Sequence, residues 1–293
     1  MPEGLPYFSL ESLEWSIYIF SENERELLAY LCEREGGPSS EELWHQPSEW
    51  QLRQVALEIS RLLHNYVAAA TSLLEHLDRI HSKLFAKREF PEFRPEKKRR
   101  ITEEPLVRFI RELRNIALHQ GDSSVSFHAS TEPLGGSVKH EVSISRSYLE
   151  GVRRWQGPAK VYLKGAPQSI ALRALVEDYG RHVRQFCEWY RERVFDIWGA
   201  EYLRYREAMK EYLRARLEGH ADNWLTDPTP PCHQIGFLRR VIDDAELSEL
   251  EHIADGSPER ADRAIALLRS HLSISEPLAE KLRKAFSVPG FRL

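Results

Sequence analysis

Cysteine is scarce in this chain of 293 residues, and Cys32, Cys187 and Cys232 lie far apart. An odd number of cysteines without regular spacing argues against a disulfide framework. No apolar run approaches the roughly 20 residues that a membrane span needs. The first ten residues, "MPEGLPYFSL", also lack the basic and apolar regions of a secretion signal. These absences predict a cytoplasmic protein that has no contact with a membrane.

Positive charge is not in excess either. The net charge of −4 excludes a globally basic nucleic-acid binder but leaves room for a local basic patch. Hydrophobic residues make up 42% of the chain and aromatic residues 10%, so a packed core is expected and a fully disordered chain is excluded. The length fits one large domain or two modest ones.

Helical periodicity is what the sequence has in abundance. Ser48 and Gln51 have the spacing of a capping box. Apolar residues then recur every three or four positions from Val55 to Leu84, without proline or glycine, which predicts a long helix of bundle type. A second long helix of this kind is expected over residues 169–219.

Other segments complete the expected organisation. Residues 22–35, "ENERELLAYLCERE", predict a short helix that ends at the breaker "GGPSS". Alternation of apolar and polar residues around "TEPLGG" predicts a β-hairpin at about 123–147. The proline-rich "LTDPTPPCH" is typical of a linker before short helices. We therefore expect a mainly α protein with an N-terminal helical segment (1–47), a helical bundle with a hairpin (48–220), and a linker with a small C-terminal helical segment (221–293).

The helix expected from Thr102 to Gln120 carries the most informative polar residues, in the stretch "RELRNIALH". At about 100° per residue, its core face consists of Leu106, Phe109, Ile110, Leu113 and Ala117. Arg114 has a planar, permanently charged donor set that matches phosphate oxygens. His119 can transfer a proton near neutral pH, and Asn115 can orient that histidine or hold a substrate.

The same stretch resembles the Arg-x4-His signature of HEPN-domain proteins, and "ISRLLHNYVAAATSLLEHLDRIH" is similar to the first long helix of uncharacterised bacterial HEPN-like proteins. The resemblance covers roughly residues 48–219. It implies a bundle of long antiparallel helices and a metal-independent endoribonuclease that works as a dimer, as a toxin or defence effector. The catalytic residues carried over are Arg114, Asn115 and His119.

Two departures from the family pattern keep an alternative open. The hairpin after the motif is an elaboration, and some members with similar helices have no known nuclease activity. The alternative function is a non-catalytic HEPN-like protein that dimerises or binds RNA or protein.

Further polar residues are secondary candidates. Asn65 is predicted to be a buried polar support for the motif helix, with packing of Tyr66 as the alternative. His76 and His81 are expected to face solvent. The basic run Lys97, Lys98, Arg99 and Arg100 suits a nucleic-acid backbone by its charge, with a solvated loop as the alternative.

No metal or cofactor is expected. The intervals between His119, His128 and His140 match no usual ligand spacing, and no pair of cysteines supports a site. The candidate partners are a second copy of the chain, an RNA substrate, and an antitoxin or other protein. Leu118 and Ile116 would provide the apolar contact of a homodimer built on the helix from Thr102 to Gln120.

Overall fold

The computed structural model describes residues 5–36, 44, 48–86, 89–119, 125–131, 138–152, 155–226, 241–242 and 244–288. The chain divides into two compact units, Met1–Gly199 and Ala200–Leu293. The N-terminal helix, which we expected to form a separate segment, is part of the larger unit. The smaller unit includes residues before the boundary expected at residue 220. No described helix has the length and apolar character needed to cross a membrane.

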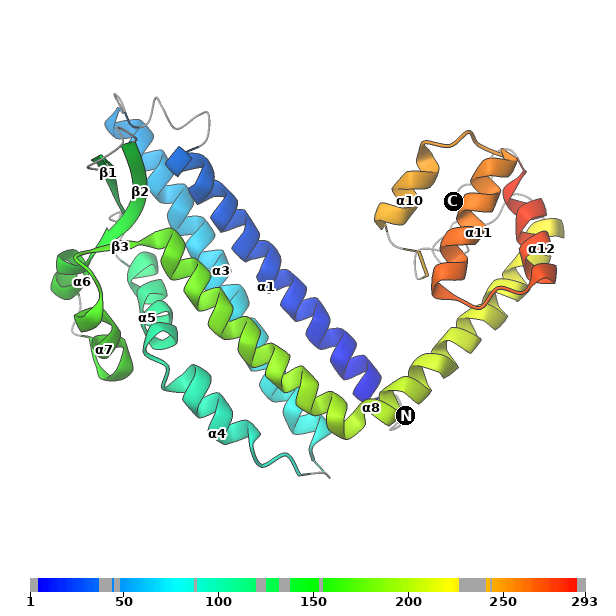
Figure 1. Ribbon diagram of the computed structural model, residues 1–293, viewed down its shortest axis with the longest axis horizontal. Helices are drawn as coiled ribbons and strands as arrows, with labels where there is room; N and C mark the ends of the chain where they lie inside the picture. Colours follow the sequence, from blue (N-terminus) through cyan, green and yellow to red (C-terminus); the bar gives the residue numbers. More distant parts are fainter. Residues whose placement is uncertain are drawn as a thin grey trace. The chain divides into compact units, whose positions relative to one another are not determined.

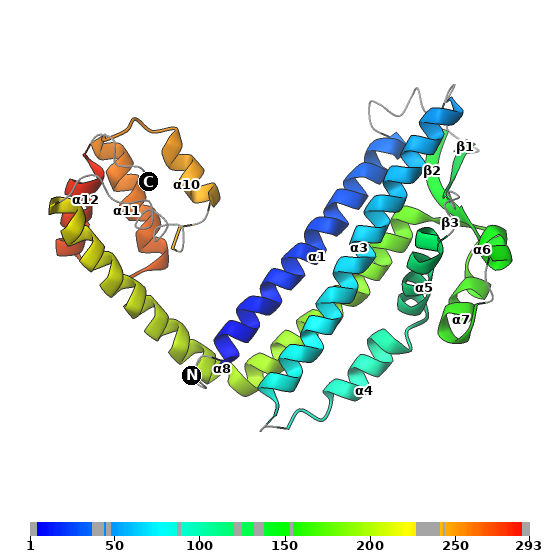
Figure 2. The same ribbon diagram turned by 180° about the vertical axis from the view of Figure 1, so that it is seen from behind.

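The larger unit is built on two long helices, α1 (Leu5–Gly36) and α3 (Glu49–Leu84), which lie side by side in both views (Figures 1 and 2). The predicted capping box of α3 is confirmed. The Gln51 backbone N–H donates to Ser48 Oγ at 3.2 Å, and the Ser48 backbone N–H donates to Gln51 Oε1 at 2.8 Å. Two of the N–H groups that a helix start leaves unpaired are thus satisfied.

Helix α1 is much longer than the short helix predicted over residues 22–35. Its buried residues include Leu13, Phe20, Leu27 and Leu31, but Trp15 on another face of the same helix is 67% exposed. Apolar residues on more than one face weaken the amphipathic pattern on which the prediction depended.

The segment after α3 contains more helix than expected. Helix α4 (Phe93–Lys97) continues into the π-helical turn η1 (Lys98–Thr102), and α5 (Pro105–His119) follows. Pro95 fits because it lies in the first turn of α4, where the missing N–H costs nothing. The basic run therefore belongs to α4 and η1 and does not form a loop.

Helix α8 (Leu172–Thr226) completes the bundle of the larger unit, in which α1, α3, α5 and α8 alternate in direction (Figure 1). The predicted apolar stripe of α8, from Leu172 to Val194, is buried. Tyr66 of α3 joins this stripe to the bundle, because its O–H donates to the Val176 carbonyl at 3.0 Å and its ring stacks on Phe20 of α1 at 5.3 Å. The mainly α fold with long helices is confirmed.

In the order of the chain, a small antiparallel sheet follows α5 and leads into α8. The predicted hairpin is confirmed as β1 (Val125–Thr131) paired with β2 (Val138–Ser145). A third strand, β3 (Ser169–Ala171), pairs with β2, so the strand order is β1-β2-β3. Helices α6 (Arg146–Val152) and α7 (Gly157–Gly165) connect β2 to β3. We had expected residues 169–171 to begin the long helix, so this end of the prediction was wrong.

The smaller unit has its own core. It contains α10 (Asp244–Glu251), α11 (Pro258–His271), α12 (Glu276–Phe286) and the end of α8. Trp224 of α8 is buried against this core, with its ring 6.0 Å from that of Phe286. Ser257 and Ser275 cap α11 and α12 by accepting a backbone N–H, which stabilises each helix start.

Candidate functional sites

The Arg-x4-His motif occupies the last two turns of α5, which ends at His119. The core face predicted for this helix is buried at Leu106, Phe109, Ile110 and Leu113. The Phe109 ring stacks on Trp155 at 5.1 Å and lies 4.7 Å from the ring of Tyr162 in α7. The first part of α5 is therefore held firmly in the bundle.

The side chains that would do chemistry in this motif are Arg114, Asn115 and His119. They lie outside the described residues, as do those of Ile116, Ala117 and Leu118. The backbone supports a motif at the carboxyl end of a helix, where the helix dipole favours a protonated histidine. The catalytic roles of the three residues stay predictions.

Asn65 and Tyr66 are adjacent on α3 but differ in burial. Asn65 is half-buried, whereas Tyr66 is fully buried and hydrogen-bonded to the Val176 carbonyl. The packing of Tyr66 that we considered as the alternative is therefore present. Support of α5 by Asn65 stays a prediction.

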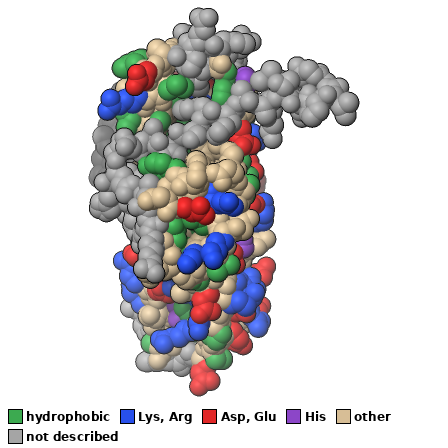
Figure 3. All heavy atoms as spheres, turned by 90° about the vertical axis from the view of Figure 1, so that its left-hand side faces the viewer, with side chains coloured by type: hydrophobic (Ala, Val, Ile, Leu, Met, Phe, Trp, Pro, Cys, Tyr) green, Lys and Arg blue, Asp and Glu red, His purple; other side chains and the backbone are tan. Residues whose placement is uncertain are grey.

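The four cations of the basic run all have carboxylate neighbours. Lys97 pairs with Asp78 of α3, and Lys98 lies 3.3 Å from Glu103. Arg99 and Arg100 each lie 2.6 Å from Glu96. On the face of the molecule in Figure 3, the coloured acidic and basic side chains are likewise interspersed. Nucleic-acid binding by this run would therefore depend on a local arrangement of charges and not on a broad basic surface.

One such arrangement is a pocket of about 350 Å³, which we call the α3–α4 pocket. Its lining residues are Asp78, His81, Ser82, Phe93, Arg94, Lys97, Lys98 and Thr102. The pocket gathers three cations and one carboxylate from segments that are separated in the sequence.

His81 is the residue of this pocket that the sequence analysis placed wrongly. Its ring is half-buried, stacked on Phe93 at 3.7 Å and on Phe85 at 4.9 Å. Burial, together with the nearby Arg94 and Lys97, lowers the pKa of His81 to about 4 in spite of Asp78. The imidazole is therefore neutral near pH 7. Its Nδ1 is buried without a hydrogen-bond partner in the described part of the chain.

His76 was also expected to face solvent and instead joins two helices. Its Nδ1 lies 2.6 Å from Ser16 Oγ and its Nε2 lies 3.2 Å from Ser12 Oγ, both on α1. Burial lowers the pKa of His76 as well. This histidine contributes to packing between α1 and α3.

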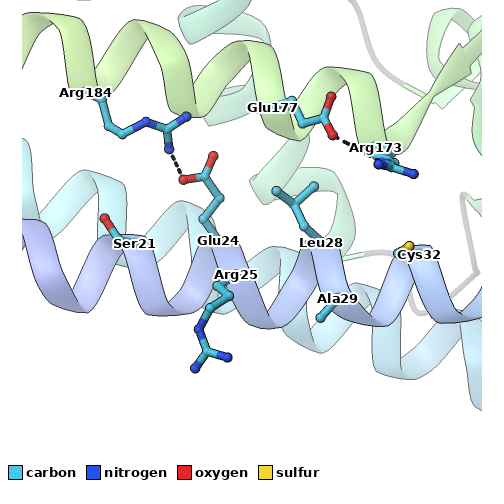
Figure 4. Close-up of a pocket in the computed structure, with 9 residues that line it drawn as sticks. All are labelled: Ser21, Glu24, Arg25, Leu28, Ala29, Cys32, Arg173, Glu177 and Arg184. Atoms are coloured by element: carbon cyan, nitrogen blue, oxygen red, sulfur yellow. Dashed lines mark hydrogen bonds and ion pairs between the residues drawn. The ribbon is translucent and has the colours of Figure 1, made fainter.

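A second hollow, the α1–α8 groove, has a volume of about 510 Å³ (Figure 4). It is lined by Ser21, Glu24, Arg25, Leu28, Ala29, Cys32, Arg173, Glu177 and Arg184. Glu24 of α1 is buried and pairs with Arg184 of α8. Burial raises the pKa of Glu24 more than Arg184 lowers it.

The other Glu24 oxygen, Oε1, has no hydrogen-bond partner among the described residues. This oxygen occupies the space where a Cβ atom of residue 180 would lie, so it is in close contact with Gly180 of α8. The sequence analysis missed this site because Glu24 and Arg184 are 160 positions apart.

The described residues contain no group of three His, Cys, Asp or Glu side chains placed to hold a metal ion. Of the three histidines considered for a metal, the His140 ring stacks on Trp44 at 4.4 Å. The side chains of His119 and His128 lie outside the described residues.

No protein-family model, curated protein or solved structure matches this chain. The functional assignment therefore depends on the motif of α5, its helical setting and the two sites described above.

Proposed function

We propose that this protein is a HEPN-type endoribonuclease that cleaves single-stranded RNA without a metal ion. The observation that carries the proposal is the position of the Arg-x4-His motif at the carboxyl end of α5, within a bundle whose long helices α3 and α8 precede and follow it. This is the helix order that the family resemblance implies. The motif is short, so its helical setting is what gives it weight.

The chemistry follows from the residue types. The ribose 2′-hydroxyl would attack the adjacent phosphorus, the P–O5′ bond would break, and a 2′,3′-cyclic phosphate would remain. His119 would move the proton between these oxygens, a role worth about 10²–10⁴-fold in rate. Arg114 would stabilise the charge that builds up on the phosphate oxygens, and Asn115 would orient the histidine or the substrate.

A homodimer is part of this proposal. One motif supplies a single arginine and a single histidine, whereas two copies related by a two-fold axis would double the set. Leu118→Asp is expected to weaken such a dimer, since it would place two like charges close together at the axis. Sedimentation at micromolar concentration measures this. A protein that is monomeric in that experiment would contradict the dimer built on α5.

The decisive experiment compares RNA cleavage by the wild type, His119→Ala and Arg114→Ala in buffer with a chelator. Both substitutions are expected to lower the rate by at least about 100-fold while the circular dichroism spectrum is unchanged. His252→Ala is the matched control, because His252 is an exposed histidine of the smaller unit. Cleavage that persists in His119→Ala, or that stops in the chelator, would refute the proposed function.

A second candidate function is a non-catalytic interaction protein. The observation that favours it is an exposed apolar face on α1, formed by Phe8, Trp15, Tyr18 and Ile19. Their spacings of three, four and seven residues put them on one side of the helix. The cleavage experiment separates the two candidates, since an interaction protein would leave the RNA intact in every variant.

A further inference from the structure

The α3–α4 pocket has features that a structural cluster of charges does not require. Its volume of about 350 Å³ lies in the range of sites for small ligands, of about 300–1,000 Å³. It is also next to η1, a five-residue π-helical turn in which the Glu103 N–H donates to the Lys98 carbonyl at 2.8 Å. Such turns are rare and are frequent at functional sites.

The charges of the pocket favour an anion. Arg94, Lys97 and Lys98 contribute three positive charges, and Asp78 contributes one negative charge, so the lining carries a net charge of +2 (+3 − 1). Lys97 is paired with Asp78, and Lys98 has Glu103 beside it. Arg94 is exposed and has no carboxylate partner in the part of the chain that the structure describes. Its planar donor set is suited to phosphate oxygens.

Neutral groups complete the site. Ser82 and Thr102 line the pocket, but the Ser82 hydroxyl already donates to the Asp78 carbonyl at 2.9 Å, so Thr102 is the residue whose hydroxyl is available to a ligand. His81, stacked on Phe93, adds an uncharged imidazole to the lining. Hydroxyl and imidazole N–H groups donate hydrogen bonds to phosphate oxygens without adding charge. Asp78 in the lining and Glu103 beside Lys98 both oppose an anion, and each is paired with a lysine, Asp78 with Lys97 and Glu103 with Lys98.

We propose that the α3–α4 pocket binds a backbone phosphate of a single-stranded RNA, with Arg94 and Lys98 as its main ligands. This inference rests on the proposed function, because it assigns a second contact for the same substrate away from α5. It also gives the basic run a specific role, in which only part of the run, together with Arg94, contacts the RNA.

The test measures binding of a fluorescein-labelled 12-nucleotide RNA by anisotropy at several KCl concentrations. The full-length His119→Ala chain is used, so that the RNA stays intact. Adding Arg94→Ala and Lys98→Ala is expected to weaken binding roughly tenfold. The slope of log K against log salt should also become shallower by about 0.7 for each phosphate that the variant no longer neutralises.

The control adds Arg181→Ala and Arg193→Ala, which remove the same charge from exposed positions of α8. Equal effects of the two pairs would overturn the proposal, since binding would then follow net charge alone. A third variant, Asp78→Asn, is expected to strengthen RNA binding about threefold by removing the repelling carboxylate. If Asp78→Asn leaves binding unchanged, the pocket is structural and the proposal fails.

Three further outcomes have clear meanings. If AMP binds the wild type at equal ionic strength and the Arg94/Lys98 variant loses AMP binding but not RNA binding, the ligand is a free nucleotide and the RNA assignment is wrong. If the wild type binds RNA through this pocket but does not cleave it, the pocket stands and the proposed endoribonuclease fails. If the wild type cleaves RNA but Arg94→Ala and Lys98→Ala do not weaken RNA binding, the proposed endoribonuclease stands and the proposal for the pocket fails.

Discussion

Glu24 of α1 and Gly180 of α8 approach each other so closely that a Cβ atom at position 180 would overlap Glu24 Oε1. Gly180 is therefore needed for the approach of the two helices and not for a special backbone conformation, since it lies inside α8. The ion pair between Glu24 of α1 and Arg184 of α8 stabilises this approach, because it keeps the Glu24 carboxylate against α8.

Gly180→Ala is expected to lower the free energy of unfolding by about 1–2 kcal/mol, because overlap of the added methyl group with the buried, ion-paired carboxylate outweighs the gain of about 0.5–1 kcal/mol that alanine brings to a helix interior. Thermal denaturation followed by circular dichroism measures the change. Gly219→Ala is the control in the same helix, because no atom lies within 4 Å of its Cβ position. This control should be neutral or stabilising by about 0.5–1 kcal/mol. Adding Glu24→Ala to Gly180→Ala should recover stability, and failure to do so would show that the clash lies elsewhere.

Glu24 should also make stability depend on pH. Its pKa is raised by burial, so the folded protein resists ionisation of this carboxyl group more than the unfolded chain does. The wild type should therefore lose stability relative to Glu24→Gln as the pH rises from about 4.5, the ordinary value. Urea titrations at several pH values measure the difference. If the wild type instead gains stability relative to Glu24→Gln as the pH rises, the ion pair with Arg184 outweighs the effect of burial on the pKa of Glu24.

His81 should give stability a pH dependence of the opposite sign to that of Glu24. Its pKa is lowered to about 4 from the ordinary 6.5, so between these pH values His81 is protonated in the unfolded chain but neutral in the folded protein. Stability should fall as the pH decreases from 6.5 to about 4, by about 1–3 kcal/mol. His81→Phe keeps a ring in the aromatic cluster and should lose less stability over this interval. The exposed His252→Ala should behave like the wild type, and an equal effect of both variants would contradict the assignment to His81.

The start of α3 is expected to depend on its capping box. Ser48→Ala removes the acceptor of the Gln51 N–H and should lower the free energy of unfolding by about 1 kcal/mol. Ser72→Ala is the matched control, since Ser72 is exposed in the middle of the same helix, where alanine is favoured. Equal melting temperatures for the two variants would show that the cap contributes nothing.

Elements that are encoded within a few residues of one another could be predicted from the amino-acid sequence alone. The capping box of Ser48 and Gln51, the apolar period of α3 and the alternation in β1 and β2 all depend on neighbouring positions, and the structure contains each of them. The core face of α5 belongs to the same class. In these elements the backbone hydrogen bonds and the direction of each side chain follow from local geometry.

Features that join distant segments became visible only in the folded chain. Strand β3 is three residues long and exists because β2 pairs with it across α6 and α7. His81 is a half-buried neutral residue, and Glu24 a buried carboxylate, because other helices pack against them and remove water. The cost of desolvating a charged group depends on which surfaces meet, and that information is spread over residues that are far apart in the chain.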